Sequence, residues 1–215
     1  MKKVKAGIKR AVILLHGELD IGDFQLQGDD FLICADGGTE HAGELGWVPD
    51  LVIGDMDSIS PILQQQIQNR GVELSIFPVE KDQTDGELAL DYALGLEVEE
   101  IVILGALGGR VDHMLSNIFM LSQGAHRKVQ IISGRQRLQV IDSQIEIQGQ
   151  VGDWVSLIPL TPEVSGIFTT GLYYELRDGT LAFGSSLGNS NRMIESVATV
   201  KIHAGKLLVV HLQDK

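Results

Sequence analysis

The sequence has a single cysteine, Cys34, and no apolar run as long as a membrane-spanning helix. One cysteine cannot form an internal disulfide, and its place in "FLICAD" predicts a buried core thiol rather than a reactive one. A membrane span needs roughly 20 consecutive apolar residues. The early apolar stretch "AVILLHG" is too short for a signal peptide and lacks a small-residue cleavage site. We therefore expect a cytoplasmic protein without a membrane anchor.

Positive charge is also scarce, because 17 Lys and Arg residues stand against 29 Asp and Glu residues, for a formal net charge of -12. Such a surface repels nucleic acid and anionic membranes unless a local basic patch intervenes. We therefore expect neither nucleic acid nor a membrane as a partner.

Several common motifs are missing as well. The sequence contains no G-x-x-x-x-G-K-[ST] run and no dinucleotide-binding fingerprint. Cysteine and histidine do not cluster at metal-ligand spacing, which argues against zinc. No Pro- or Ser-rich linker, internal repeat or low-complexity segment divides the chain. Any domain boundary must therefore be read from a change in the pattern of predicted elements.

The first part of the chain alternates short apolar runs with segments of helical period. With 215 residues and 44% hydrophobic content, the chain can bury a sizeable core. The runs that predict strands are residues 11–15, 31–35, 51–54, 72–77, 101–105 and 129–133. Helices are predicted after Ser60, with Pro61 in the first turn and Gly71 at the end, and after a capping box from Thr84 to Glu87. Runs that are apolar throughout predict an α/β domain with a mostly parallel sheet covered by helices.

After residue 135 the pattern changes to short segments rich in β-forming residues and separated by Gly, Asp, Asn or Pro. Among them are "RLQVID", "DWVSLIP", "LYYELR" and "KLLVVHL". This half is typical of an antiparallel sandwich or barrel, and we predict an all-β sandwich. The predicted domains are residues 1–135 and 136–215.

Acidic and glycine-rich segments follow four successive predicted strands. They are "DGG" from Asp36, "DMDS" from Asp55 to Ser58, "KDQTD" from Lys81 to Asp85, and "GALGGRVDH" from Gly105 to His113. The carboxyl ends of parallel strands share one edge of a sheet, where ligands bind. Each acid also has a structural alternative, since an Asp after a strand commonly forms a turn or caps a helix. The sequence therefore predicts a site at this edge. For Asp82, Thr84 and Asp112 the alternative is a purely structural role at the start of a helix.

Carboxylates that converge must share a cation or protons, or have shifted pKa values. A set of oxygen ligands without cysteine favours magnesium, which commonly bridges carboxylates to a polyphosphate. Glycines at 105, 108 and 109 would let backbone N–H groups approach an anion, beside Lys81 and Arg110. The pattern therefore indicates that an acidic chain binds a nucleotide through a metal ion and local donors.

The motifs "ADGG", "GDMDS", "KDQTD" and "GGRVDHMLSN", in this order, resemble those of the thiamine pyrophosphokinase family. The second half is similar too, in "GLYYEL", "LAFG" and "NSN", so the resemblance covers nearly the whole chain. It implies transfer of a diphosphoryl group from ATP to thiamine. It further implies an α/β domain for ATP and Mg²⁺, a vitamin-binding β-sandwich, and a homodimer with vitamin sites between subunits.

The resemblance also implies roles for individual residues. The implied metal ligands are Asp55, Asp57 and Asp85, which with Arg110 form the implied catalytic set. The implied nucleotide-binding residues are Asp36, Lys81, Asp82, Gln83, Thr84, Gly108, Gly109, Arg110 and Asp112. Ser190 and Asn191 match positions near the aminopyrimidine, and Tyr174 falls where some members have a tryptophan that packs on the vitamin. The resemblance assigns no role to His16 and leaves that of His113 open.

Two alternative functions remain at this point. The D-x-D-S segment at Asp55 also resembles the nucleophile loop of haloacid-dehalogenase-type phosphatases. A non-catalytic nucleotide or thiamine sensor could retain the same pockets. The three functions differ in their products, because a phosphatase releases inorganic phosphate, a sensor releases nothing, and the diphosphotransferase releases AMP.

Overall fold

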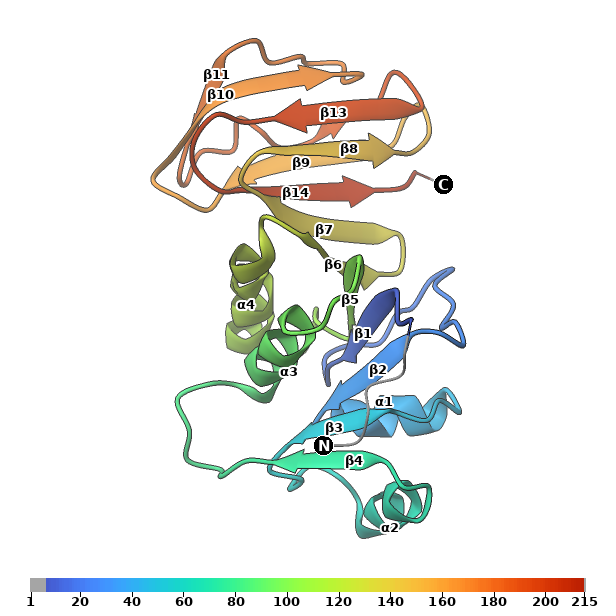
Figure 1. Cartoon of the computed structure of the whole chain (residues 1–215). Helices are drawn as coiled ribbons and strands as arrows, with labels where there is room; N and C mark the ends of the chain where they lie inside the picture. Colours follow the sequence, from blue (N-terminus) through green and yellow to red (C-terminus); the bar gives the residue numbers. More distant parts are fainter. Residues whose placement is uncertain (1–6, 215) are drawn as a thin grey trace. The chain divides into compact units, whose positions relative to one another are not determined.

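The structure, a computed structural model, describes residues 7–214, and the chain divides into two compact units (Figure 1). The first unit is Met1–Met120 with Ile132–Gly134, and the second is Leu121–Ile131 with Arg135–Lys215. Each unit has its own cluster of buried hydrophobic side chains. Within residues 7–214, none of the helices combines the length and the apolar character that crossing a membrane requires.

A five-stranded parallel sheet forms the centre of the first unit. Its strands are β1 (Arg10–Leu14), β2 (Phe31–Ala35), β3 (Leu51–Gly54), β4 (Glu73–Ile76) and β5 (Glu100–Leu104). They lie in the order β5-β1-β2-β3-β4, and every neighbouring pair is parallel. β2 and β3 are buried along their whole length, because helices cover both faces of the sheet. The predicted parallel α/β domain is confirmed.

The helices of this unit are α1 (Gly38–Glu44), α2 (Pro61–Asn69), α3 (Asp85–Leu94) and α4 (Val111–Met120). Ala42 of α1 and Ile67 of α2 pack with Val12 and Leu32 in one buried cluster. α3 covers the opposite face, where Tyr92 stacks on Phe31 of β2. A short 3₁₀ helix, η1 (Leu121–Gly124), follows α4. The sequence pattern did not predict α1, because "GTEHAGE" has too few apolar residues to show a helical period.

The predicted helix ends are present. Ser60 caps α2 by accepting a hydrogen bond from Leu63 N, Pro61 occupies the first turn, and Gly71 follows the helix with a φ of 69°. The hydroxyl of Thr84 accepts a hydrogen bond from Glu87 N at 3.2 Å and caps α3. Thr84 therefore has the structural role that the capping box predicts.

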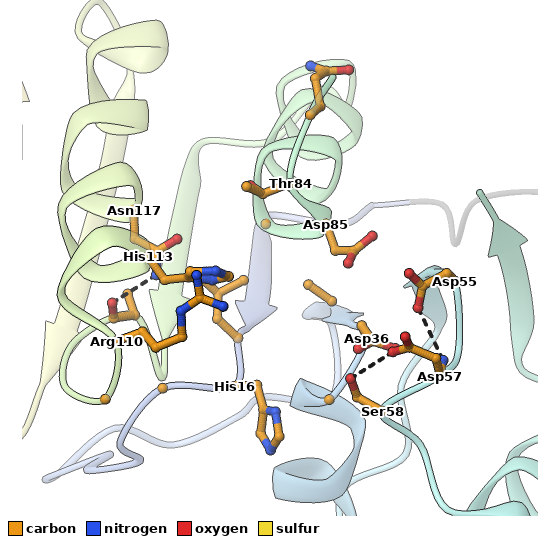
Figure 2. Close-up of a pocket in the computed structure, with 18 of the residues that line it drawn as sticks. His16, Asp36, Asp55, Asp57, Ser58, Thr84, Asp85, Arg110, His113 and Asn117 are labelled. Atoms are coloured by element: carbon orange, nitrogen blue, oxygen red, sulfur yellow. Dashed lines mark hydrogen bonds between the residues drawn. The ribbon is translucent and has the colours of Figure 1, made fainter. Parts of the chain in front are cut away.

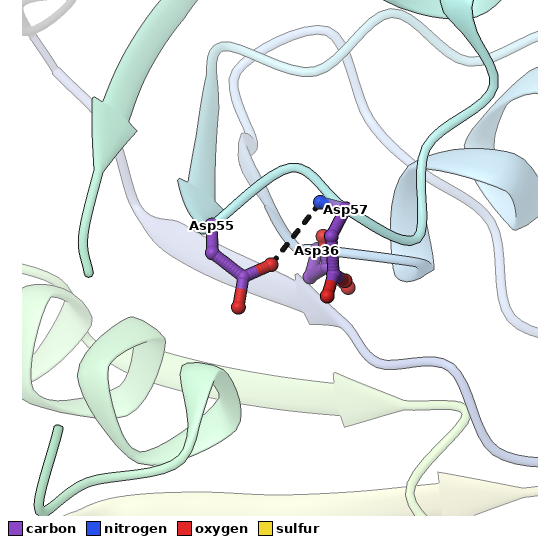
Figure 3. Close-up of side chains that lie close together, drawn as sticks. All are labelled: Asp36, Asp55 and Asp57. Atoms are coloured by element: carbon purple, nitrogen blue, oxygen red, sulfur yellow. Dashed lines mark hydrogen bonds between the residues drawn. The ribbon is translucent and has the colours of Figure 1, made fainter. Parts of the chain in front are cut away.

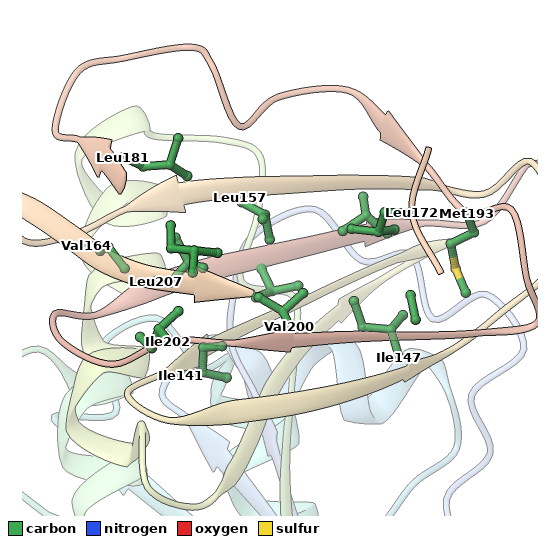
Figure 4. Close-up of a cluster of buried hydrophobic side chains, with 14 residues drawn as sticks. Ile141, Ile147, Leu157, Val164, Leu172, Leu181, Met193, Val200, Ile202 and Leu207 are labelled. Carbon is green, nitrogen blue, oxygen red and sulfur yellow. The ribbon is translucent and has the colours of Figure 1, made fainter. Parts of the chain in front are cut away.

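The second unit is a sandwich of two antiparallel sheets (Figure 4). Its strands are β7 (Gln136–Ile141), β8 (Gln144–Gln148), β9 (Trp154–Pro159), β10 (Glu163–Thr170), β11 (Gly179–Ala182), β12 (Asn191–Arg192), β13 (Val197–Lys201) and β14 (Leu207–Leu212). β6 (Lys128–Ser133) passes from this unit into the first. One sheet runs β12-β9-β14-β7 and the other β11-β10-β13-β8, with side chains of both in one buried cluster. The predicted sandwich is confirmed.

One predicted strand of this unit is wrong. "LYYELR", residues 172–177, forms only an isolated bridge between Leu172 and Met193. Its backbone is held by separate hydrogen bonds rather than by a strand ladder. Tyr173 N donates to Arg192 O, the Thr169 hydroxyl accepts a hydrogen bond from Leu176 N, and the Asn191 amide binds Tyr174. Local side-chain partners compete with a strand ladder in this way.

Candidate active site

A cavity of about 700 Å³ opens at the carboxyl ends of the parallel strands (Figure 2). Its walls come from the segments after β1, β2, β3, β4 and β5 and from α3 and α4. β1 lies between β2 and β5: the strands that follow it in sequence, β2 to β4, lie on one side of it, and β5 lies on the other. Such a point leaves a crevice beyond the strand ends, where open α/β sheets bind ligands.

Three carboxylates converge on one side of this cavity (Figure 3). One oxygen from each of Asp36, Asp55 and Asp57 lies within 4.8 Å of the other two. Asp36 follows β2 and the other two follow β3, and these strands are neighbours in the sheet. The backbone N–H of Asp57 donates to Asp55 Oδ1 at 3.1 Å, and the Ser58 hydroxyl donates to Asp57 Oδ1 at 3.0 Å. We call Asp36, Asp55 and Asp57 the carboxylate triad.

The backbone around the triad adopts conformations that most residues avoid. Asp36 has a φ of 41° and Met56, between the other two acids, has a φ of 67°. Gly54 has a φ of 150°, and a Cβ there would lie 2.8 Å from Asp36 Cβ, so glycine lets β3 approach Asp36. Left-handed conformations at non-glycine residues are disfavoured and occur frequently at functional sites. The fold holds these carboxylates together despite both strain and charge repulsion.

The triad fits a hard divalent cation. Asp36 Oδ1 is buried and accepts no hydrogen bond from the residues that the structure describes. A buried carboxylate oxygen without a partner is costly unless a ligand completes its environment. The donors are all carboxylate oxygens, which suits Mg²⁺.

Asp85, at the start of α3, lies outside the triad and is paired with Lys81. The Lys81 ammonium lies 3.0 Å from Asp85 Oδ1 and 3.9 Å from Asp55 Oδ2. Burial raises the pKa of the Asp85 carboxyl; Lys81 opposes this effect without cancelling it. Lys81 therefore connects Asp85 electrostatically to the triad, while Asp85 as a direct metal ligand stays a prediction.

The loop after β5 forms the opposite side of the cavity. Gly108 and Gly109 have φ values of 77° and 67°, and both line the cavity with Arg110. Arg110 is exposed and donates two hydrogen bonds to Asp112, at 3.1 and 2.5 Å. This pairing raises the pKa of Arg110 and lowers that of Asp112 to about 2. The guanidinium is thus already held in a forked contact with an anion, as it would grip a phosphate.

Of the remaining predicted nucleotide-binding residues, two line the cavity and two do not. Gln83 and Thr84 line the cavity, and Gln83 donates to Asp91 at 2.7 Å. Asp82 and Asp112 are exposed and do not belong to the cavity lining.

The polar side chains of the lining that received no role from the sequence include His16, His113 and Asn117. His16 lies two residues beyond the end of β1, and its ring lies edge-on to that of His41 with centroids 5.4 Å apart. Asn117 of α4 donates to Ala106 O at 2.9 Å. The position of His16 immediately after an apolar run was the signal that could have found it.

The predicted vitamin-binding residues lie on the sandwich unit. Asn191 is only 8% exposed, and its amide makes two hydrogen bonds to the backbone of Tyr174: Tyr174 N donates to Oδ1 at 3.0 Å, and Nδ2 donates to Tyr174 O at 2.8 Å. The rings of Tyr173 and Tyr174 are exposed and meet edge to face at 4.8 Å. Ser190 has a φ of 59°, and its N–H donates to the Ser156 hydroxyl. Asn191 therefore fixes the backbone beneath an exposed aromatic pair.

Comparisons with known proteins find family models and relatives that match most of the chain. Two family models match the chain, the thiamin pyrophosphokinase catalytic domain over residues 25–133 and the thiamin pyrophosphokinase vitamin B1 binding domain over residues 142–207. A thiamine pyrophosphokinase of Bacillus subtilis is 32% identical over 186 residues, which cover 85% of this chain and 87% of that protein.

Solved structures give the same result. A crystal structure of thiamine pyrophosphokinase from Bacillus subtilis superposes with a TM-score of 0.86 at 31% identity, covering 96% of this chain and 100% of that one. A thiamin pyrophosphokinase from Geobacillus thermodenitrificans gives a TM-score of 0.84 at 30% identity, covering 96% and 98%. The chain belongs to the thiamin pyrophosphokinase family.

Proposed function

We propose that the protein transfers the diphosphoryl group of ATP to the hydroxyl of thiamine, which gives thiamine diphosphate and AMP. The observation that carries this proposal is the carboxylate triad, which faces a cavity that also holds Arg110 and Lys81. Within residues 7–214, Asp36 Oδ1 of this triad has no hydrogen-bond partner. In this proposal the nucleotide chemistry belongs to residues 1–135 and vitamin binding to residues 136–215. The family match disfavours the phosphatase, whose nucleophile would be Asp55.

Positioning and charge neutralisation must supply most of the catalysis, since the thiamine hydroxyl attacks the β-phosphorus in line and AMP leaves. Mg²⁺ bound by the triad would neutralise the polyphosphate and orient its oxygens. Lys81 and Arg110 add positive charge, and the left-handed Gly108 and Gly109 leave room for phosphate oxygens. The half-buried Asp85, whose pKa is raised, suits the removal of the hydroxyl proton.

Mass spectrometry of the products tests the function directly. Purified protein with ATP, Mg²⁺ and thiamine is expected to form equimolar thiamine diphosphate and AMP. Inorganic phosphate as the main product would support the phosphatase instead, and unchanged ATP and thiamine would support the sensor.

Arg110→Lys is expected to lower kcat/KM for ATP about tenfold, because lysine keeps the charge but loses the planar fork that grips two oxygens. Arg177→Lys is a matched control, since Arg177 is an exposed arginine on the sandwich unit that likewise pairs with a nearby acid, Glu175. Steady-state kinetics with varied ATP measures both variants. An unchanged kcat/KM in Arg110→Lys would remove Arg110 from the site.

We further propose a homodimer in the cytoplasm, with each vitamin site shared between subunits. The thiol of Cys34 is fully buried, and burial raises its pKa, so it is suited to remain a core thiol in a reducing compartment.

Mixed dimers test the shared site. Assayed at thiamine well below the wild-type KM, where each parent has little activity, Asp57→Asn protein combined with a Tyr174→Ala/Asn191→Ala protein should recover about a quarter of the wild-type activity. This fraction follows because half of randomly paired dimers are mixed and one site of each mixed dimer is intact. Tagged co-purification verifies subunit exchange. Verified mixed dimers without activity above either parent would refute the shared site.

A further inference from the structure

A second cavity, of about 410 Å³, lies within the sandwich unit and shares no lining residue with the first. Its walls come from β6, β7, β8 and β14. The volume is in the range of small-molecule sites, which combine an apolar wall with a few converging polar groups. The lining residues are Lys128, Gln130, Arg137, Gln139, Ile145, Glu146, Ile147, Gln148, Val209 and His211.

The inner face of one sheet becomes polar toward this cavity. On β7 and β14 the directly opposed pairs are Ile141 with Leu207, then Gln139 with Val209, then Arg137 with His211. Alternate residues share a face, so all three pairs point to the same side as the buried core formed by Ile141, Leu207 and Val209. Packing favours apolar residues at such positions, and packing alone gives no reason for a directly opposed arginine and histidine.

His211 is buried and firmly oriented. It is 5% exposed, and its Nε2 lies 2.9 Å from Oδ2 of Asp153, which is 2% exposed. A Cβ on Gly149 would lie 2.5 Å from Asp153 Oδ2 and 2.9 Å from His211 Nε2, so glycine makes room for this pair. With Nε2 fixed by Asp153, Nδ1 is the ring nitrogen left for another partner.

Asp153 has a structural role that does not account for His211. Its carboxylate accepts hydrogen bonds from the backbone N–H groups of Gln150 and Asp214, both at 2.9 Å. Burial raises the pKa of Asp153, but these bonds and the contact with His211 outweigh burial, and the pKa lies below its ordinary value. The carboxylate therefore holds the Gln150–Asp153 turn and the backbone N–H of Asp214 by itself, whereas the imidazole extends to the cavity wall.

The charges of the lining indicate the chemistry of a ligand. Lys128 and Arg137 against Glu146 leave one positive charge in excess, in a chain whose formal net charge is -12. Arginine has five N–H donors, so Arg137 can bind an oxyanion while it keeps another contact. Ile145 and Ile147 of β8 supply an apolar wall.

We propose that this cavity binds a small organic anion, with its carboxylate or phosphate oxygens beside Arg137 and His211 and its apolar part against β8. Nothing in this proposal depends on the diphosphotransferase activity. The two oxyanions share the same recognition chemistry, and separate probes distinguish them.

The test follows the imidazole signals of the full-length protein by NMR, with His211→Gln used to assign the His211 signal among the six histidines. Phenyl phosphate and benzoate are titrated separately, with benzyl alcohol as the neutral probe of similar shape. We expect at least one anion to shift the His211 signal with saturation, and benzyl alcohol to leave it unchanged. The anion with the lower Kd identifies the preferred oxyanion.

Arg137→Gln is expected to weaken binding at least about tenfold, the scale of a charge-assisted hydrogen bond. Arg135→Gln is the matched control, because Arg135 lies two positions away, outside the lining, and donates to Gln213 O. If Arg137→Gln does not fold, Gln139→Leu replaces it, with an expected loss of about threefold or more. No saturable shift, equal binding of benzyl alcohol, or equal loss in Arg135→Gln would overturn the proposal.

Discussion

Asp36→Asn and Asp57→Asn are each expected to lower the Mg²⁺-dependent turnover of ATP and thiamine by more than about a hundredfold, the scale for loss of a principal charge-stabilising element. Asparagine keeps the shape and one oxygen but removes the charge from the triad. Because the acids repel one another without a cation, both variants should fold at least as stably as the unsubstituted protein without Mg²⁺. Steady-state kinetics and thermal unfolding with and without Mg²⁺ measure these effects.

Asp142→Asn serves as the control, since Asp142 is an exposed acid in the turn between β7 and β8. Calorimetric titration with Mg²⁺ should show weaker binding in the two triad variants and no change in the control. Near-normal Mg²⁺ binding and activity in Asp36→Asn would remove Asp36 from the metal site. The site would then rest on the residues that the motif resemblance implied: Asp55, Asp57 and Asp85.

The comparison between Asp36 and Asp85 shows what a sequence can predict about this site. The apolar runs located the strands, and the acids that follow them lie at one edge of the sheet as expected. Which acids meet depends on strand order and backbone shape. Asp36 meets Asp55 because β2 is paired with β3 and Gly54 permits the approach, whereas Asp85 meets Lys81 from the loop that precedes α3. Neither fact is present in a pattern of residue types.

The second unit shows a different limit. Short β-rich segments predicted the sandwich, because an alternating pattern records which side chains face the core. The same pattern failed at "LYYELR", where the Thr169 hydroxyl accepts from Leu176 N, Asn191 Nδ2 donates to Tyr174 O, and separate backbone bonds stand in place of a strand ladder. The sequence alone does not predict which groups the side-chain amide of Asn191 hydrogen-bonds. Asn191, which the resemblance places near the vitamin, accepts a hydrogen bond from the backbone N–H of Tyr174.

That position leads to the last prediction, which concerns how Asn191 acts and rests on the proposed function. Tyr174→Ala should raise KM for thiamine about tenfold, because it removes an exposed aromatic surface that can stack on the vitamin. Asn191→Ala should have a similar effect, because it removes both hydrogen bonds that hold the Tyr174 backbone. KM for ATP should stay unchanged in both variants. Asn189→Ala, at an exposed asparagine two positions away, should change neither KM.

The double variant distinguishes positioning from direct contact. If Asn191 acts only by holding Tyr174, Asn191→Ala added to Tyr174→Ala should raise KM for thiamine by less than about twofold, since the ring it positions is already absent. If Asn191 bonds the vitamin itself, the two effects should multiply to about a hundredfold. Asn191→Asp adds a further check, because it keeps the acceptor for Tyr174 N and loses the donor to Tyr174 O. A residue that acts through Tyr174 predicts two results. Asn191→Asp should have a KM for thiamine between those of the unsubstituted protein and Asn191→Ala, and the effects of Tyr174→Ala and Asn191→Ala should not multiply in the double variant.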